Sequence, residues 1–251
     1  MLEERDSGRY RILPLVTDHA MRAVDIVFRR TDGLEFAHEL RARFTRDLDS
    51  TANADFQLRA ALLASRHAKI QEIRALVDAP GATEADAQKA LRGQWWIFGG
   101  AYMGESARRR LLPSLEIDIP LLRPGGILHL VELKGPGVTT IKRHRPHIQV
   151  TTSDVNDAVG QVAGYLRMLD EKRDDVLARL KIDTRRCGGT VVIGDPTGNG
   201  LHGDVVSEVL RGYNSHLSRI DVVTYGQLLD SAERGLSWEV GELFEAKVDD
   251  Q

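Results

Sequence analysis

The chain has 251 residues, of which 42% are hydrophobic and 28% are charged, and these values are ordinary for a globular protein of one large domain or two small ones. Its formal net charge of -3 argues against a protein that coats nucleic acid by bulk charge, although it leaves room for a local basic groove. The single cysteine, Cys187, excludes an internal disulfide and fits a reducing cytoplasm, and we expect neither a membrane helix nor a signal peptide, because no apolar run approaches ~20 residues and the start MLEERDSGRYRIL is charged.

Residues 1–82 are expected to form an N-terminal region of unknown role that is partly helical. Residues 9–16 (RYRILPLV) are compatible with a short strand, whereas residues 21–30 fit a strand or a helix equally well. Between about residues 52 and 77, apolar residues recur at spacings of three, four or seven, which predicts a helix. The segment APGAT then marks the boundary before the second domain, residues 83–251.

The second domain alternates between predicted helices and strands. Its first helix begins at Thr83, whose side chain can cap the helix together with Asp86. The apolar runs LLPSLEIDIPLL and ILHLVELKG, separated by RPGG, predict a hairpin. After them come a helix that starts at Ser153 or Asp154, the strand GGTVVIGDP, a helix near residues 203–218, the strand IDVVTY and a last helix near residues 226–234. This order predicts an α/β (α+β) fold with a central mixed sheet flanked by helices.

The stretch ILHLVELKGPG at residues 127–137 places Glu132 and Lys134 on one face of an apolar strand. The turn RPGG permits two registers for the hairpin, and we choose the one that sets Asp118 opposite Glu132 and Glu116 opposite Lys134. A slip of one residue would turn Asp118 to the other face of the sheet. The prediction of a site therefore depends on this register.

The charges on this patch have two explanations. Opposed carboxylates are unfavourable, and a divalent cation would offset them, because hard oxygen ligands bind Mg²⁺ or Mn²⁺ together with phosphate oxygens of a substrate. A water would then attack a phosphorus atom, and Lys134 can orient it, help to deprotonate it or stabilise the phosphorus centre. The alternative is a structural salt bridge of Lys134 with Glu132 or Glu116, and spacing alone leaves both open.

Two further segments bear on the chemistry. Gln161 and Tyr165 share a helix face, where the amide can hold a lysine or a water and the hydroxyl can reach a phosphate; by themselves they also fit an ordinary helix surface. The loop TTIKRHRPHIQVTTSD that precedes this helix carries Lys142, Arg143 and Arg145, with no acid before its final residue. It is predicted to contact a DNA backbone beside the acidic patch, and a solvated basic loop is the alternative.

Taken together, Asp118, Glu132, Lys134 and the helix with Gln161 and Tyr165 resemble the PD-(D/E)xK nuclease superfamily. The surrounding segments sharpen the resemblance to the C-terminal nuclease domain of the Shedu anti-phage defence proteins; these are QWWIFGGAYMG, EIDIPLL, HLVELKGP, VTTSDVNDAVGQVAGYLR, TVVIGD and IDVVTYGQLLD. The resemblance covers about residues 83–234 and leaves residues 1–82 unmatched.

This resemblance implies a restriction-endonuclease-like fold and a set of roles. Asp118 and Glu132 would be metal ligands with the Leu133 carbonyl as a third, and Lys134 would be the catalytic lysine, supported by Gln161. The superfamily often has one more acid on a helix before the hairpin, for which Glu105 is the candidate. Members of the family self-associate, so the resemblance also implies a homo-oligomer.

Three hypotheses follow. The first is a Mg²⁺- or Mn²⁺-dependent DNA endonuclease in bacterial anti-phage defence. The second is a non-catalytic DNA-binding or sensor module on a nuclease fold. The third is a structural scaffold, in which replacing Asp118 by alanine would stabilise the fold because it relieves crowding between anions.

Overall fold

The computed structural model describes residues 2–5, 9–12, 54–194 and 203–245 of the chain. Contacts divide the chain into one unit of Glu72–Glu233 and another of Met1–Gln71 with Arg234–Gln251. In the second unit, β2 (Arg9–Ile12) pairs antiparallel with β1 (Leu2–Arg5), as expected of a strand there, while residues 13–16 and 21–30 lie outside the described residues. No helix in the described ranges is long and apolar enough to cross a membrane.

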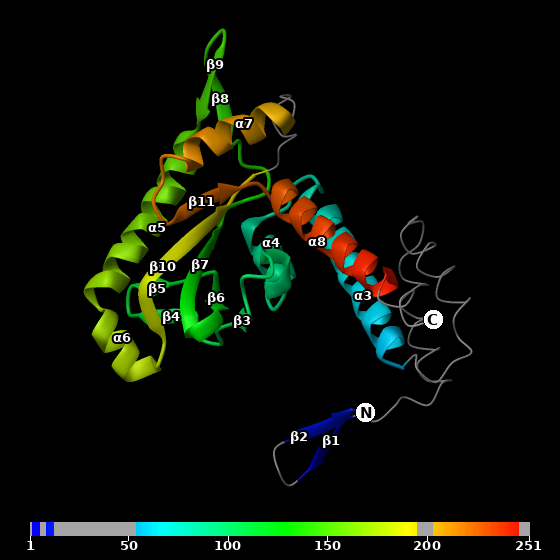
Figure 1. The fold of residues 1–251 in the computed structure, drawn as a ribbon. Helices are drawn as coiled ribbons and strands as arrows, with labels where there is room; N and C mark the ends of the chain where they lie inside the picture. Colours follow the sequence, from blue (N-terminus) through cyan, green and yellow to red (C-terminus); the bar gives the residue numbers. More distant parts are fainter. Residues whose placement is uncertain (1, 6–8, 13–53, 195–202, 246–251) are drawn as a thin grey trace. The chain divides into compact units, whose positions relative to one another are not determined.

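A five-stranded mixed sheet forms the centre of the larger unit, in the order β11-β10-β7-β6-β3, and it confirms the predicted α/β class (Figure 1). Its strands are β3 (Gly104–Glu105), β6 (Ile119–Arg123), β7 (Ile127–Leu133), β10 (Asp183–Val192) and β11 (Ile220–Val223). The last three run parallel to one another, whereas β6 is antiparallel to β7 and β3 is antiparallel to β6. The carboxyl ends of β7, β10 and β11 therefore meet at one edge of the sheet.

The hairpin of β6 and β7 has the predicted register. Ile119 pairs with Val131 and Leu122 pairs with Leu128, so Asp118, the residue before β6, lies one position beyond the ladder on the Glu132 side. The turn is a short 3-10 segment, η3 (Pro124–Gly126), in which Gly125 has a φ of 80° that favours glycine. The register on which the site depends is thus confirmed.

The prediction that LLPSLEIDIPLL forms one continuous strand is wrong in its first half. The segment LLPSLE folds back on itself as a separate hairpin of β4 (Arg110–Leu112) and β5 (Leu115–Glu116), so Glu116 pairs with Arg110 and not with Lys134. Pro113 and Ser114 form the turn, because proline has no N–H for a sheet ladder and both residue types favour turns.

The predicted helices are present with shifted ends, except that the one helix expected over residues 153–180 is divided at Lys172 into two. They are α3 (Ala54–Val77), α4 (Glu84–Leu91), α5 (Ser153–Glu171), α6 (Arg173–Leu180), α7 (Gly203–Asn214) and α8 (Tyr225–Glu245). The capping box at α4 is confirmed, since Thr83 and Asp86 each accept a backbone N–H from the other. Thr152, one residue before the predicted cap, precedes α5. The chain after α4 continues as a 3-10 turn, η2 (Trp95–Phe98).

Helix α5 packs its apolar face against the sheet and carries the second half of the predicted site. Its buried side chains, among them Val162 and Leu166, join Leu130 and Val191 in the main core. Gly189 permits this close approach, because a Cβ atom there would lie 2.5 Å from the Val162 side chain. The position of α5 along β7 is therefore fixed by core packing.

The segment predicted as a basic loop is instead a hairpin. Strand β8 (Ile141–Arg145) pairs antiparallel with β9 (Ile148–Thr151) in a two-stranded sheet of its own, and Figure 1 shows it projecting from the five-stranded sheet beyond α7. The run of charged residues hid the strand pattern from the sequence.

Candidate active site

A polar pocket of about 470 Å³ lies where β7 ends. Five residues predicted from the sequence line it, namely Asp118, Glu132, Lys134, Gln161 and Tyr165. The other lining residues are Glu84, Ala85, Gln88, Arg109 and Glu116. Strand β7 supplies Glu132, and Lys134 follows directly after it, while α4 and α5 contribute from two other directions.

Glu132, Lys134 and Gln161 form a closed set of hydrogen bonds. Lys134 Nζ donates to Glu132 Oε1 at 2.8 Å and to Gln161 Oε1 at 3.0 Å. Gln161 Nε2 donates to Glu132 Oε1 at 2.5 Å and to the Tyr165 hydroxyl at 2.7 Å. The salt bridge between Lys134 and Glu132 is therefore present, and the amide of Gln161 holds both of its members.

The environment acts on the proton affinity of both charged groups. Burial raises the pKa of the Glu132 carboxyl, the hydrogen bond from Lys134 partly offsets this, and the charge of Asp118 raises the pKa further. For Lys134, burial lowers the pKa, but the hydrogen bond to Glu132 and the charges of Glu132, Glu84 and Asp118 outweigh it and raise the pKa. Lys134 is therefore a firmly protonated cation at neutral pH.

Asp118 is held by three groups at the point where β6 separates from β7. Its Oδ2 accepts the Leu133 N–H at 2.9 Å, its Oδ1 accepts from Gln88 Nε2 at 2.6 Å, and Arg109 lies 3.5 Å from Oδ1. In an extended strand the N–H and C=O of one residue point to the same edge, so the Leu133 carbonyl lies on the Asp118 side of β7.

The oxygen donors fit one kind of metal. Among the described residues, no group of three His, Cys, Asp or Glu side chains is arranged to hold an ion, and three or four such ligands are what zinc sites commonly use. Magnesium and manganese differ, because they use one or two carboxylates and take the rest of their ligands from water and phosphate. Within the described chain, Glu132 Oε2 accepts no hydrogen bond, which leaves it available beside Asp118 and the Leu133 carbonyl.

Comparison with known families decides the identity of this unit. Residues 81–229 match the family model described as Shedu protein SduA, C-terminal. The chain belongs to this Shedu family. It is accordingly a Shedu defence protein, and the matched range contains every residue that lines the pocket. No curated protein matches the chain.

One residue implied by the Shedu resemblance lies elsewhere. Glu105 was expected on a helix, but it lies on the short edge strand β3, where its carboxylate accepts the Gly93 N–H at 2.7 Å, and it does not line the pocket. The chain is extended here because it leaves the η2 turn through Gly99, whose φ is 102°. The acid that does reach the pocket from a helix before the hairpin is Glu84 on α4.

Sequence reasoning missed four residues of the Shedu site. Glu84 and Gln88 are four apart on α4, and this spacing could have shown that both face one direction. Arg109 reaches Asp118 and also donates from Nε to the Ile117 carbonyl at 3.0 Å, for which no sequence pattern gives a signal. Tyr225 begins α8 and donates its hydroxyl to the Lys134 carbonyl at 2.7 Å.

The cations predicted to contact DNA lie outside the pocket. Lys142, Arg143 and Arg145 belong to β8 and are all exposed, whereas Tyr165 lines the pocket itself from α5. The four residues thus occupy two separate surfaces of the Shedu domain, one on the hairpin and one beside Glu132.

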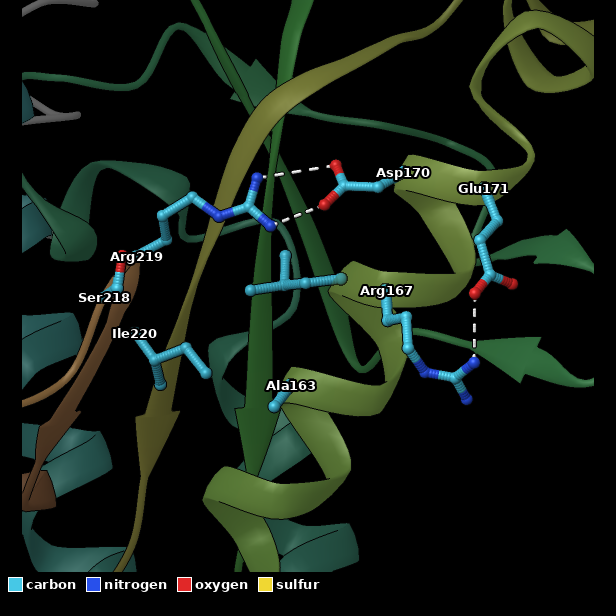
Figure 2. Close-up of a pocket in the computed structure, with 8 residues that line it drawn as sticks. Ala163, Arg167, Asp170, Glu171, Ser218, Arg219 and Ile220 are labelled. Atoms are coloured by element: carbon cyan, nitrogen blue, oxygen red, sulfur yellow. Dashed lines mark hydrogen bonds and ion pairs between the residues drawn. The ribbon is translucent and has the colours of Figure 1, made fainter.

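A second hollow, of about 270 Å³, lies between α5 and the start of β11 (Figure 2). Its two arginines are already neutralised, since Arg219 pairs with both oxygens of Asp170 and Arg167 pairs with Glu171 at 3.0 Å (Figure 2). This hollow therefore lacks an uncompensated charge for a phosphate, and the pocket beside β7 is the candidate active site.

Proposed function

We propose that this protein is a Mg²⁺- or Mn²⁺-dependent DNA endonuclease that acts in anti-phage defence. The observation that carries the proposal is the joining of Asp118, Glu132, Lys134 and Gln161 at the end of one strand. The second oxygen of Glu132 accepts no hydrogen bond within the described residues and is not a buried atom, so it faces the solvent of the pocket, where a cation can reach it.

Asp118, Glu132 and the Leu133 carbonyl would hold the metal. When bound, a divalent cation supplies a Lewis acid that stabilises negative charge on the scissile phosphate. Glu84 adds negative charge to the same pocket from α4 and favours a cation there. Arg109 would have to release Asp118 or share it, because a carboxylate oxygen 3.5 Å from a guanidinium is already partly neutralised.

Lys134 acts as a positioned cation. Held by Glu132 and Gln161, it would orient the attacking water and stabilise the extra charge on the phosphorus oxygens. The water oxygen attacks phosphorus and gives up its proton to solvent, the phosphorus–oxygen ester bond breaks, and the leaving oxygen takes up a proton from solvent. Gln161 holds the Lys134 ammonium in this position, because its Oε1 accepts a hydrogen bond from Lys134 Nζ.

The DNA would be held by positive and hydroxyl groups near the pocket. Lys142, Arg143 and Arg145, which are exposed on β8, would contact backbone phosphates, and the Tyr165 hydroxyl, which lines the pocket, would contact the phosphate there. We also propose that the protein works in the cytoplasm and that it forms a homo-oligomer. Light scattering of the purified protein would test the oligomeric state.

Cleavage assays test the proposal directly. Linear and supercoiled DNA are incubated with the protein and Mg²⁺ or Mn²⁺, in parallel with Lys134→Ala and Glu132→Ala and with Lys172→Ala as a control of the same charge change on an exposed residue. We expect cleavage by the parent protein and the control only. Cleavage that is unchanged in Lys134→Ala or Glu132→Ala contradicts the assignment of these residues.

One observation favours a second candidate, a DNA-binding or sensor module without cleavage. Each motif carboxylate is already engaged by a cation, Glu132 by Lys134 and Asp118 by Arg109, so the pocket is stable with no metal. This candidate requires salt-dependent DNA binding and intact DNA after incubation with every divalent metal.

A further inference from the structure

We propose that the β8–β9 hairpin enters the major groove of double-stranded DNA and holds the duplex beside the pocket. The inference rests on the proposed function and deepens it, because it assigns a duplex as the form of DNA that is bound. Four features of the hairpin carry it, namely its fixed base, its exposed and uncompensated charge, its width and its place in the chain.

The base of the hairpin is buried and rigidly attached. Thr152 donates its N–H to the Thr140 carbonyl at 3.0 Å and its hydroxyl to the Thr139 carbonyl at 2.7 Å. Thr140, Ile141 and Thr152 are buried, whereas every residue from 142 to 148 is exposed. The hairpin is therefore an arm with a fixed root and a solvent-facing outer part.

The charge on the outer part is of one sign and lacks compensation. Residues 142–147 contain Lys142, Arg143 and Arg145 with two histidines, and no acid occurs between residues 139 and 153. Within the described ranges none of the three cations pairs with a carboxylate, whereas Arg167, Arg173 and Arg179 on α5 and α6 each do. Like charges on neighbouring strand positions repel one another, so this arrangement fits a polyanionic partner.

The shape of the arm selects among nucleic acids. It is a two-stranded ribbon, with Lys142 opposite Val150 and Arg143 opposite Gln149. A ribbon of this kind fits the major groove of B-DNA, which is about 12 Å wide, but not the minor groove at about 6 Å. Strand β8 extends roughly 16 Å, enough to span the groove depth of about 8.5 Å. Single-stranded DNA has no groove that the hairpin could enter.

The place of the arm in the chain connects it to the chemistry. It is inserted between the strand that carries Glu132 and the helix that carries Gln161, so each of its ends continues into one half of the site. From the start of α5 to Gln161 is about 12 Å along the helix axis, the length of roughly four base pairs. The roughly 16 Å of β8 adds to this distance, so a duplex held by the outer part of the arm would lie within about one helical turn of the pocket.

Binding experiments without metal test the arm separately from cleavage. The full-length protein is titrated in EDTA against a fluorescein-labelled duplex and against one of its strands, over a range of salt concentrations. The arm variant is Lys142→Ala/Arg143→Ala/Arg145→Ala, and the matched control is Arg167→Ala/Arg173→Ala/Arg179→Ala, which also removes three exposed positive charges. We expect the arm variant alone to lose duplex affinity, with its slope of log K against log salt reduced by about 3.

Methylation footprinting identifies the groove. Dimethyl sulfate modifies guanine N7 in the major groove and adenine N3 in the minor groove, so we expect the parent protein to protect guanine N7 and the arm variant to lose that protection. Protection of adenine N3 alone, equal affinity for single strand and duplex, or an arm variant that binds like the control would each overturn the proposal. If the parent protein binds duplex through the arm but does not cleave DNA with any divalent metal, the arm proposal stands and the nuclease proposal fails.

Discussion

The hydroxyl of Tyr225 donates a hydrogen bond of 2.7 Å to the main-chain carbonyl of Lys134. Tyr225 is fully buried at the start of α8, and its own N–H donates to the Gly194 carbonyl at 3.1 Å. The residue after β7 is therefore held by a helix more than 90 positions later in the chain. This contact makes Tyr225 a positioning residue for Lys134.

Replacing Tyr225 by phenylalanine leaves the Lys134 carbonyl without this donor. We expect a loss of about 1–3 kcal/mol in the free energy of unfolding, and a kcat for DNA cleavage that falls while KM changes little. Urea unfolding and steady-state kinetics measure the two effects. Tyr213→Phe is the matched control, because it removes only an exposed hydrogen bond to Asn156, and equal effects of the two variants would contradict the positioning role.

Glu84 and Glu105 offer a matched pair of acidic residues. Glu84 lines the pocket and its charge raises the pKa of both Glu132 and Lys134, whereas Glu105 is bonded to the Gly93 N–H on β3. We expect Glu84→Gln to raise the Mn²⁺ concentration needed for half-maximal cleavage about tenfold, and Glu105→Gln to leave it near the parent value. Titrations of the cleavage rate with Mn²⁺ measure this concentration. A larger increase for Glu105→Gln than for Glu84→Gln would support Glu105 as the additional acid that the resemblance implies.

Asp118→Ala distinguishes a metal site from anionic crowding. The substitution leaves the Leu133 N–H and the Gln88 amide without their acceptor, so we expect the variant to lose about 1–3 kcal/mol of stability. We also expect Mn²⁺ to raise the Tm of the parent protein but not that of the variant. A variant that is more stable than the parent would support the scaffold hypothesis.

His129 predicts an acid-sensitive fold. Burial lowers the pKa of His129 to about 4, and nearby Arg123 adds to the effect. The unfolded chain takes up a proton below pH 6.5 and the folded chain does not until about pH 4, so stability is complete above pH 6.5 and falls as pH decreases across this window. The difference amounts to about 3 kcal/mol.

The geometry around His129 explains the low affinity for a proton. Arg123 Nη2 lies 3.2 Å from Nδ1 and can only donate, so Nδ1 must be the unprotonated nitrogen while Nε2 donates to Thr190 Oγ1 at 2.9 Å. Urea unfolding between pH 4 and pH 7 measures the slope. We expect His129→Asn to flatten it and His144→Asn, on the exposed arm, to leave it unchanged; an unchanged slope in His129→Asn would rule out His129 as its source.

The half of the site on the β6–β7 hairpin could be predicted because local patterns fix it. The turn permitted two registers, and the structure has the chosen one, which places Asp118 beside Glu132. Gln161 and Tyr165 followed from helix periodicity in the same way. Their chemical roles remain predictions, because position alone does not establish what a carboxylate binds.

The rest of the site depends on contacts between distant segments. Arg109 reaches Asp118 only because Pro113 turns the chain back after β4, and Tyr225 reaches Lys134 only because β11 lies beside β10. Neither relationship leaves a spacing that a sequence can display. The arm was mistaken for a loop because its outer residues are charged on both faces, which removes the alternation that marks a strand.

The pair of hydrogen bonds from Thr152 to Thr139 and Thr140 closes the chain on itself at the root of the arm. The exposed residues 142–148 beyond this root lie outside the main core, so we expect changes in them to leave the ends of β7 and α5 in place. The proposed DNA-binding surface of the arm can therefore vary separately from the residues that line the pocket beside β7. Arms exchanged between members of the family should carry their DNA preference with them.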